Sequence, residues 1–213
     1  MTLKVVISDF DGTLVESAGI KDEAFHALYS DEAPEHLDEI MAYHKAHNAT
    51  LRFEKFRHIH ERILGKPYTE ADAARLSARF SELVFERIVA APPVPGLKAF
   101  LEAVAGLPLY LVSMSPDEEL ARILAARHLD CNLAGVYPGS WQKAAAVRDI
   151  LAREGAARGE AVYLGDTDED RQVAEAVGVP FIGRDSGRLI RGDCPIYANL
   201  HGIVAHLKTL RAA

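Results

Sequence analysis

The stretch "VISDFDGTLVES" places two carboxylates, Asp9 and Asp11, one residue apart at the end of an apolar run. Like charges this close repel, and each disfavours ionisation of the other. A fold that keeps such a pair needs something to offset the repulsion, and a metal ion or a shared proton is the usual candidate. An Asp-Gly step after a strand is also an ordinary turn signal, so the pair alone does not establish a site.

Four further polar residues stand at the ends of other apolar runs. Ser113 ends "LPLYLVS", Lys143 opens the helix expected after residue 139, and Asp166 and Asp170 lie in "GDTDED". Carboxylates in a cluster suit a hard cation such as Mg²⁺, which prefers a few carboxylates plus substrate phosphate oxygens. A hydroxyl and an ammonium group bind anionic groups. Gathered at one point, these residues would make a site for phosphoryl transfer, in which a carboxylate can also act as a nucleophile.

The elements that must bring these residues together alternate along the chain. Five short runs rich in apolar and β-branched residues predict strands covered on both faces, at residues 3–8, 107–113, 134–139, 161–166 and 179–183. Helical patterns separate the later runs, at residues 117–127, 141–153 and 168–177. This order predicts an α/β fold, a doubly wound, Rossmann-like parallel sheet whose strands carry the polar residues at one edge.

Residues 17–91 interrupt that alternation with helical periodicity alone. One apolar stripe runs from Leu37 to His44, a second through residues 50–64, and Thr69 with Asp72 forms a capping signal. The prolines of "APPVPG" then end the helical block. We therefore expect a core formed by residues 1–16 and 92–213, with a helical cap inserted at 17–91. Ligands of such sheets bind beyond the carboxyl ends of the strands, so the insertion would lie over the site.

The composition of the chain limits the kinds of partner that the protein is expected to bind. The net charge of −7 argues against a nucleic-acid or anionic-membrane partner, and 49% hydrophobic with 26% charged residues is ordinary for a globular protein. Cys131 and Cys194 are too few for a disulfide framework or a zinc cluster. With no apolar run of signal-peptide or membrane-spanning length, we expect a cytoplasmic protein.

Together these motifs resemble those of the haloacid dehalogenase superfamily of phosphohydrolases. "DFDGT" at 9–13 is similar to the first motif, Ser113 to the second, Lys143 to the third and "GDTDED" to the fourth. "PGLKAFLEAV" resembles the segment that returns such chains from a type I cap to the core. The resemblance spans nearly the whole chain and includes phosphoglycolate phosphatase-like and β-phosphoglucomutase-like members, of which we take the first as the model. Ala144, where these often have proline, and "VES" in place of "VDS" depart from the subgroup pattern.

The resemblance implies a role for each matching residue. Asp9 would be the nucleophile, and Asp11 a general acid that later serves as general base. Mg²⁺ would be held by the Asp9 carboxylate, the Asp11 backbone carbonyl and Asp166, and Asp170 would help through water or by holding Lys143. Ser113 and Lys143 would bind phosphoryl oxygens. Gly12 would permit a sharp turn, braced by Thr13.

Substrate choice would then rest with the cap. In residues 50–64, a helical step of about 100° per residue places Phe53, Phe56 and His60 on one apolar arc, with Arg52 at its border and Lys55 outside it. We expect Arg52, and less surely Lys55 or Arg57, to bind a second anionic group of a small phosphorylated metabolite. The alternative is that each stem packs while its charge stays in solvent or pairs with a nearby glutamate.

Several residues keep a second interpretation. Ser115 competes with Ser113 for the second motif, while Asp168 and Glu169 suit the first turn of a helix better than a metal. His44 is expected to be partly buried and hydrogen-bonded, and Trp141 to pack on the core. A phosphomutase on the same scaffold, or a binding protein that retains the fold, are the alternatives to a phosphatase.

Overall fold

The computed structural model describes residues 3–47, 50–188 and 190–212. Contacts within the chain divide it into two compact units. An α/β unit contains the residues up to Glu16 and those from Ala91 onward, and a helical unit contains Ser17–Ala90.

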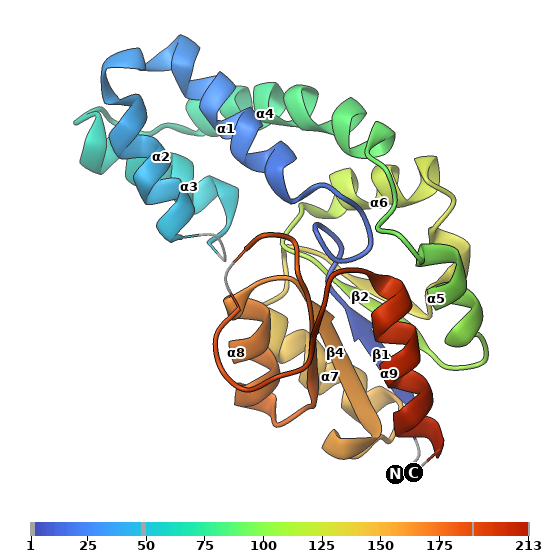
Figure 1. Ribbon diagram of the computed structural model, residues 1–213. Helices are drawn as coiled ribbons and strands as arrows, with labels where there is room; N and C mark the ends of the chain where they lie inside the picture. Colours follow the sequence, from blue (N-terminus) through green and yellow to red (C-terminus); the bar gives the residue numbers. More distant parts are fainter. Residues whose placement is uncertain (1–2, 48–49, 189, 213) are drawn as a thin grey trace. The chain divides into compact units, whose positions relative to one another are not determined.

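The α/β unit is built on a parallel six-stranded sheet in the order β3-β2-β1-β4-β5-β6 (Figure 1). The strands are β1 Val5–Ser8, β2 Leu109–Val112, β3 Gly135–Tyr137, β4 Ala161–Gly165, β5 Phe181–Arg184 and β6 Ile196–Tyr197. All five predicted strands form, and the doubly wound α/β class is confirmed. Because β1 lies at the centre, between β2 and β4, every residue from Val5 to Ser8 is buried, which explains its continuous apolar run.

Helices cover both faces of this sheet. On one face α7 (Lys143–Arg153) and α8 (Asp168–Val177) pack side by side over Val5, Ile7 and Tyr163. On the other face α5 (Leu97–Ala103) packs against α9 (Leu200–Ala212). The helix α6 (Asp117–Ala126) follows β2. The predicted helices at 117–127, 141–153 and 168–177 are confirmed to within two residues at each end.

No element was predicted after residue 183, yet β6 and α9 form there. The strand β6 has two residues, too few for an alternating pattern to be recognised. Its pairing comes from the sheet, where it extends the edge beside β5.

The chain leaves and re-enters the α/β unit along paired segments. The Glu16 N–H donates to the Pro92 carbonyl at 3.0 Å, and the Val94 N–H donates to the Leu14 carbonyl at 3.0 Å. These bonds fix where residues 17–90 are inserted.

The helical unit consists of α1 (Ala18–Glu32), α2 (Leu37–Ala46), α3 (Arg52–His58) and α4 (Glu70–Ala90), with a π-helical segment, Ile59–Ile63, after α3. The predicted cap of α4 is confirmed, because Thr69 Oγ1 donates to Asp72 Oδ2 at 2.6 Å and accepts the Asp72 N–H at 3.2 Å. His44 is buried and its Nε2 lies 2.9 Å from Asp22 Oδ1, as expected.

The predicted apolar arc over residues 50–64 is partly wrong. Phe53 is 42% exposed, whereas Lys55 is only 4% exposed and its Nζ lies 3.3 Å from His44 Nδ1. Both residues lie in the regular helix α3, whose buried face carries Lys55 and Phe56, so the predicted arc was centred too far toward Phe53. Within the described part of the chain, no helix is both long and apolar enough to cross a membrane.

Candidate active site

Three carboxylates meet at the carboxyl ends of the central strands. Asp9 follows β1, Asp166 follows β4 and Asp170 lies in the first turn of α8. One oxygen from each lies within 4.8 Å of the others, and all three residues are buried. The parallel register of β1 and β4 places the ends of these strands side by side, as the sequence predicted.

Lys143, the first residue of α7, links two of these carboxylates. Its Nζ donates to Asp9 Oδ1 at 2.8 Å and to Asp170 Oδ1 at 2.7 Å. Although burial opposes a charged amine, Asp170 and Asp9 raise the pKa of Lys143 well above its ordinary value, so it remains an ammonium group. The motif lysine therefore lies among the carboxylates and not in solvent.

Of the three clustered carboxylates, Asp170 has the most hydrogen-bond donors. Besides Lys143, Tyr163 Oη donates to its Oδ1 at 3.1 Å and Thr167 Oγ1 to its Oδ2 at 2.7 Å. Burial alone would raise its pKa, but the Lys143 charge and these hydrogen bonds hold that pKa below its ordinary value. Gly165 makes room for it, because a Cβ there would lie 2.4 Å from the Asp170 Cβ.

Asp166 has the opposite environment. Both of its carboxylate oxygens are buried and accept no hydrogen bond. Burial, followed by the charges of Asp9 and Asp170, raises its pKa to about 8, and the Ser186 hydroxyl and the Arg188 charge oppose this shift only in part. A buried carboxylate without a donor is costly unless a cation compensates it. Three carboxylates beside one ammonium group leave excess negative charge, so this donor set fits a divalent metal with oxygen ligands.

Asp9 lies between these two environments. Burial raises its pKa to about 6, with contributions from Asp170 and Asp11, while Lys143 opposes the shift. Lys143 Nζ engages Asp9 Oδ1. At neutral pH the Asp9 side chain is consequently an ionised carboxylate held beside a cation.

The loop after β1 carries the second predicted carboxylate. Ser115 Oγ lies 3.4 Å from Asp11 Oδ2, and Ser113 Oγ accepts the Ser115 N–H at 3.2 Å. Ser113 and Ser115 are both buried beside the site. Either serine could therefore serve as the second motif. The expected brace from Thr13 is wrong for its hydroxyl, because Thr13 Oγ1 is buried without a hydrogen-bond partner.

The remaining predicted site residue, Arg52, belongs to the helical unit. Its guanidinium lies 4.6 Å from the centre of the Phe80 ring and donates to Ser81 Oγ at 3.0 Å. Arg57 lies over the Tyr68 ring, and Lys55 is directed into the unit beside His44. Trp141 is 41% exposed, yet its ring packs nearly perpendicular to that of Tyr137, a core residue, at 5.0 Å between ring centres, so the expectation that it packs on the core is met on one side of the ring only.

Sequence reasoning missed two residues of this edge. Tyr163 lies within β4 and contacts Asp170, but in the sequence it is one more apolar strand residue. Arg184 ends β5 and donates to the Gly12 carbonyl. The sequence feature that could have pointed to Arg184 is a cationic residue at the carboxyl end of a buried strand.

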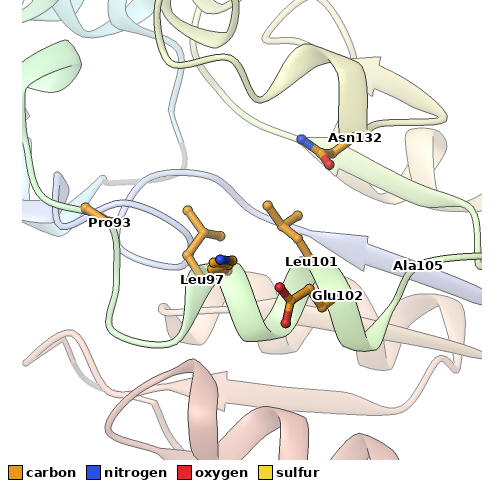
Figure 2. A pocket seen from close by; sticks show the side chains of 7 residues that line it. Pro93, Leu97, Leu101, Glu102, Ala105 and Asn132 are labelled. Atoms are coloured by element: carbon orange, nitrogen blue, oxygen red, sulfur yellow. The ribbon is translucent and has the colours of Figure 1, made fainter.

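A surface groove of about 500 Å³ lies elsewhere on the α/β unit, along α5. Figure 2 shows Leu97 and Leu101 projecting from α5 on one side, toward the segment that carries Asn132. Its lining is mostly apolar and includes none of the clustered carboxylates, so the groove is separate from the acidic cluster.

Comparisons with known proteins agree with this geometry. A family model described as haloacid dehalogenase-like hydrolase matches residues 3–178. The phosphoglycolate phosphatase of Escherichia coli K12 is 28% identical over 208 residues, which cover 87% of this chain and 82% of that protein. The phosphoglycolate phosphatase of Shigella sonnei has the same identity and coverage.

Solved structures share the fold. A hydrolase from Pseudomonas syringae matches with a TM-score of 0.74 at 21% identity, covering 97% of this chain and 98% of the other. A haloacid dehalogenase-like hydrolase of Bacillus subtilis, solved with bound magnesium, matches with a TM-score of 0.74 at 13% identity, covering 98% and 100%. The chain is an enzyme that belongs to the haloacid dehalogenase-like hydrolases.

Proposed function

We propose that this protein is a Mg²⁺-dependent phosphatase that hydrolyses a small phosphorylated metabolite through an aspartyl-phosphate intermediate on Asp9. The observation that supports it most directly is the cluster of Asp9, Asp166 and Asp170, in which Lys143 donates to Asp9 and Asp170 while the buried Asp166 oxygens have no hydrogen-bond partner. Such a cluster suits phosphoryl transfer, where positioning and charge stabilisation dominate catalysis.

Asp9, Asp166 and the Asp11 carbonyl would hold the metal ion. When bound, Mg²⁺ neutralises charge on the phosphoryl oxygens and on the neighbouring carboxylates. Asp170, already surrounded by Lys143, Tyr163 and Thr167, acts chiefly by holding Lys143. These three donors support that role over contact with the metal through water, the two possibilities that the sequence left open for Asp170.

In the first step, an Asp9 carboxylate oxygen attacks phosphorus and the bond from phosphorus to the ester oxygen breaks. Asp11 donates a proton to that oxygen, which leaves as an alcohol. Lys143 and Ser113 bind the phosphoryl oxygens and stabilise their charge.

In the second step, Asp11, now a carboxylate, takes a proton from a water molecule that attacks the phosphorus. The bond between phosphorus and the Asp9 oxygen breaks, releasing inorganic phosphate and restoring the Asp9 carboxylate. Separating one displacement into two in this way lowers each barrier.

The helical unit is proposed to act as the cap that selects the substrate, with Arg52 as its candidate contact for a second anionic group. Because the sequence relatives are phosphoglycolate phosphatases, 2-phosphoglycolate, which carries a carboxylate beside its phosphate, is the first substrate to test. The two free cysteines are compatible with the cytoplasmic location we propose.

The test is phosphate release from p-nitrophenyl phosphate, 2-phosphoglycolate and a panel of other phosphate esters, with Mg²⁺ and with EDTA. We expect turnover only with Mg²⁺, and none for Asp9→Asn. Glu169→Gln is the matched control, because it removes a carboxylate from the same acidic segment but outside the cluster.

Other outcomes would identify the alternatives. An isomerised sugar phosphate formed from a sugar 1-phosphate would indicate a phosphomutase. Turnover by Asp9→Asn equal to the wild type would remove Asp9 as nucleophile. Neither Mg²⁺ binding nor turnover of any ester would favour a binding protein.

A further inference from the structure

Arg184 connects the end of β5 to the loop that follows β1. It is only 6% exposed, and its Nη1 donates to the Gly12 carbonyl at 3.0 Å. Its Nη2 forms an ion pair with the Glu16 carboxylate. One guanidinium therefore holds both ends of the segment from Gly12 to Glu16, immediately after Asp11.

Gly12 is the residue in this loop whose conformation needs to be held. It has a φ of 79°, in the left-handed region, and glycine populates that region about as readily as the right-handed one. Its N–H, which shares a peptide plane with the Asp11 carbonyl, donates to the Val15 carbonyl at 2.8 Å. Its own carbonyl accepts from Arg184, so the peptide planes on both sides of Gly12 are fixed.

The chemistry of the side chain suits this task. A guanidinium presents several N–H donors in a rigid fork and can engage a carbonyl and a carboxylate together, which a lysine ammonium does less well. A buried cation is also strongly disfavoured without an anionic partner, and Glu16 supplies one. The contact is consequently a built feature of the loop and not an incidental surface pair.

We propose that Arg184 is a positioning residue for the reaction. By holding the Gly12 turn it directs the Asp11 backbone carbonyl and side chain toward the cluster formed by Asp9 and Asp166. The proposal rests on the proposed function in one respect, namely that Asp11 supplies both the acid-base carboxylate and a carbonyl ligand for Mg²⁺. Arg184 itself touches neither the metal nor the substrate.

The test compares Arg184→Met and Arg184→Lys with the wild type. Arg127→Met is the matched control, because Arg127 is a half-buried arginine of the same unit that donates to a backbone carbonyl, that of Ala91, at 2.8 Å. Three quantities are measured in the full chain: Mg²⁺ affinity by titration calorimetry, kcat and KM with p-nitrophenyl phosphate, and hydrogen exchange at the amides of Gly12, Leu14 and Val15.

We expect Arg184→Met to weaken Mg²⁺ binding and lower kcat, each by roughly 10- to 100-fold, the range typical of residues that orient metal ligands. KM should change much less, and exchange at the three amides should accelerate. Arg184→Lys, which retains the charge and can reach one acceptor, should recover part of each loss. Arg127→Met should keep wild-type kcat, Mg²⁺ affinity and loop exchange even if its melting temperature falls.

Wild-type values for kcat, Mg²⁺ affinity and loop exchange in Arg184→Met would overturn the proposal. If Arg184→Met does not fold, Arg184→Lys decides in the same way: loss of kcat with faster loop exchange supports positioning, and wild-type behaviour refutes it. A wild-type enzyme that releases no phosphate would instead refute the proposed function. The exchange measurement would then still report whether Arg184 orders the loop.

Discussion

At the residue scale, Asp166 and Asp170 show how one short motif can produce two different carboxylates. Asp170 accepts hydrogen bonds from Lys143, Tyr163 and Thr167, and its pKa is lowered. Asp166, four residues earlier, accepts none, and its pKa is raised to about 8. The spacing in "GDTDED" places Asp166 directly after β4 and Asp170 in the first turn of α8, within reach of donors from α7, β4 and the residue before α8.

The first prediction concerns the carboxylate that lacks donors. Asp166→Asn should abolish Mg²⁺ binding and turnover, yet raise the melting temperature of the metal-free protein, because a carboxyl whose pKa is raised to about 8 by burial destabilises the fold at neutral pH and asparagine does not titrate. A gain of about 1 kcal/mol would correspond to roughly 2–4 °C for a chain of this size. Scanning calorimetry in EDTA measures the shift, and titration calorimetry measures Mg²⁺ binding.

Asp185→Asn serves as its control, because Asp185 is an exposed aspartate directly after the neighbouring strand β5. It should leave Mg²⁺ binding intact. Normal Mg²⁺ affinity in Asp166→Asn would show that Asp166 is not a metal ligand.

The second prediction concerns Tyr163, which lies among apolar residues in the sequence of β4. Tyr163→Phe removes only the hydroxyl that donates to Asp170. A hydrogen bond to a buried charged group contributes about 1.5–3 kcal/mol, so the free energy of unfolding should fall by roughly that amount. Urea denaturation measures this change.

Tyr137→Phe is the matched control. Its hydroxyl also donates to an aspartate, but Asp149 is 39% exposed and water can replace the lost partner. We therefore expect Tyr137→Phe to lower the free energy of unfolding by less than Tyr163→Phe. An equal decrease in the free energy of unfolding in the two variants would mean that the hydrogen bond from Tyr163 to Asp170 stabilises the protein no more than the partly exposed one from Tyr137.

At the element scale, the apolar pattern of the sequence predicted the strands of the α/β unit well. It predicted the buried faces of helices in the helical unit less well. Four strands were recognisable because each is covered on both faces, so apolar residues are continuous, while β3 is only partly buried. The stretch at 50–64 was partly misassigned because residue polarity placed Phe53 inside and Lys55 outside, whereas packing within the helical unit buries Lys55 and exposes Phe53. Thr69 and Asp72, by contrast, cap α4 as their spacing predicts.

The third prediction concerns this cap. Thr69→Ala should reduce the free energy of unfolding by about 1 kcal/mol, because it removes the hydroxyl that accepts the Asp72 N–H. Ser77→Ala, within the same helix, is the control and should not destabilise, since alanine is the better helix former. Guanidinium denaturation of both variants at pH 7 provides the comparison.

The same cap gives a pH dependence with a definite sign. Hydrogen bonds from Thr69 hold the pKa of Asp72 below its ordinary value of 3.8. Its contribution to stability is therefore present above the unfolded-state pKa and lost as the pH falls through the folded-state value. Asp72→Asn should be less stable than the wild type at pH 7, and this gap should narrow below about pH 4; a gap independent of pH would contradict the assignment.

At the scale of the whole molecule, the paired segments at 14–16 and 92–94 make the insertion of residues 17–90 structurally simple. The chain departs and returns at hydrogen-bonded neighbours, so the α/β unit is closed without the inserted segment. The helical unit has its own buried core, built on Phe25, Ile40, Phe56 and Phe80.

The fourth prediction follows from that arrangement. Replacing residues 17–90 by a short glycine-serine linker should leave a folded α/β unit, because closing a short loop between adjacent ends costs little entropy. It should still bind Mg²⁺ but lose discrimination among phosphate esters. Circular dichroism, titration calorimetry and the ester panel test this, and an unfolded α/β unit would show that the helical unit is needed for its stability.

The sequence by itself determined the fold class and the identity of the acidic cluster. Apolar runs specify buried parallel strands, and parallel strands end at one edge, so Asp9, Asp166 and Lys143 converge for reasons that local pattern contains. The motifs also identified the family, because the order of these residues and their positions at strand ends agree with the family's motifs.

Only the tertiary structure decided which groups surround each of these residues. Arg184 lies 172 residues from Gly12, and Tyr163 and Lys55 each reach a partner on a different element, so no periodicity along one element records these contacts. Burial and hydrogen-bond donors depend on what packs nearby in space, which is why Asp166 and Asp170 differ although the sequence presents them alike.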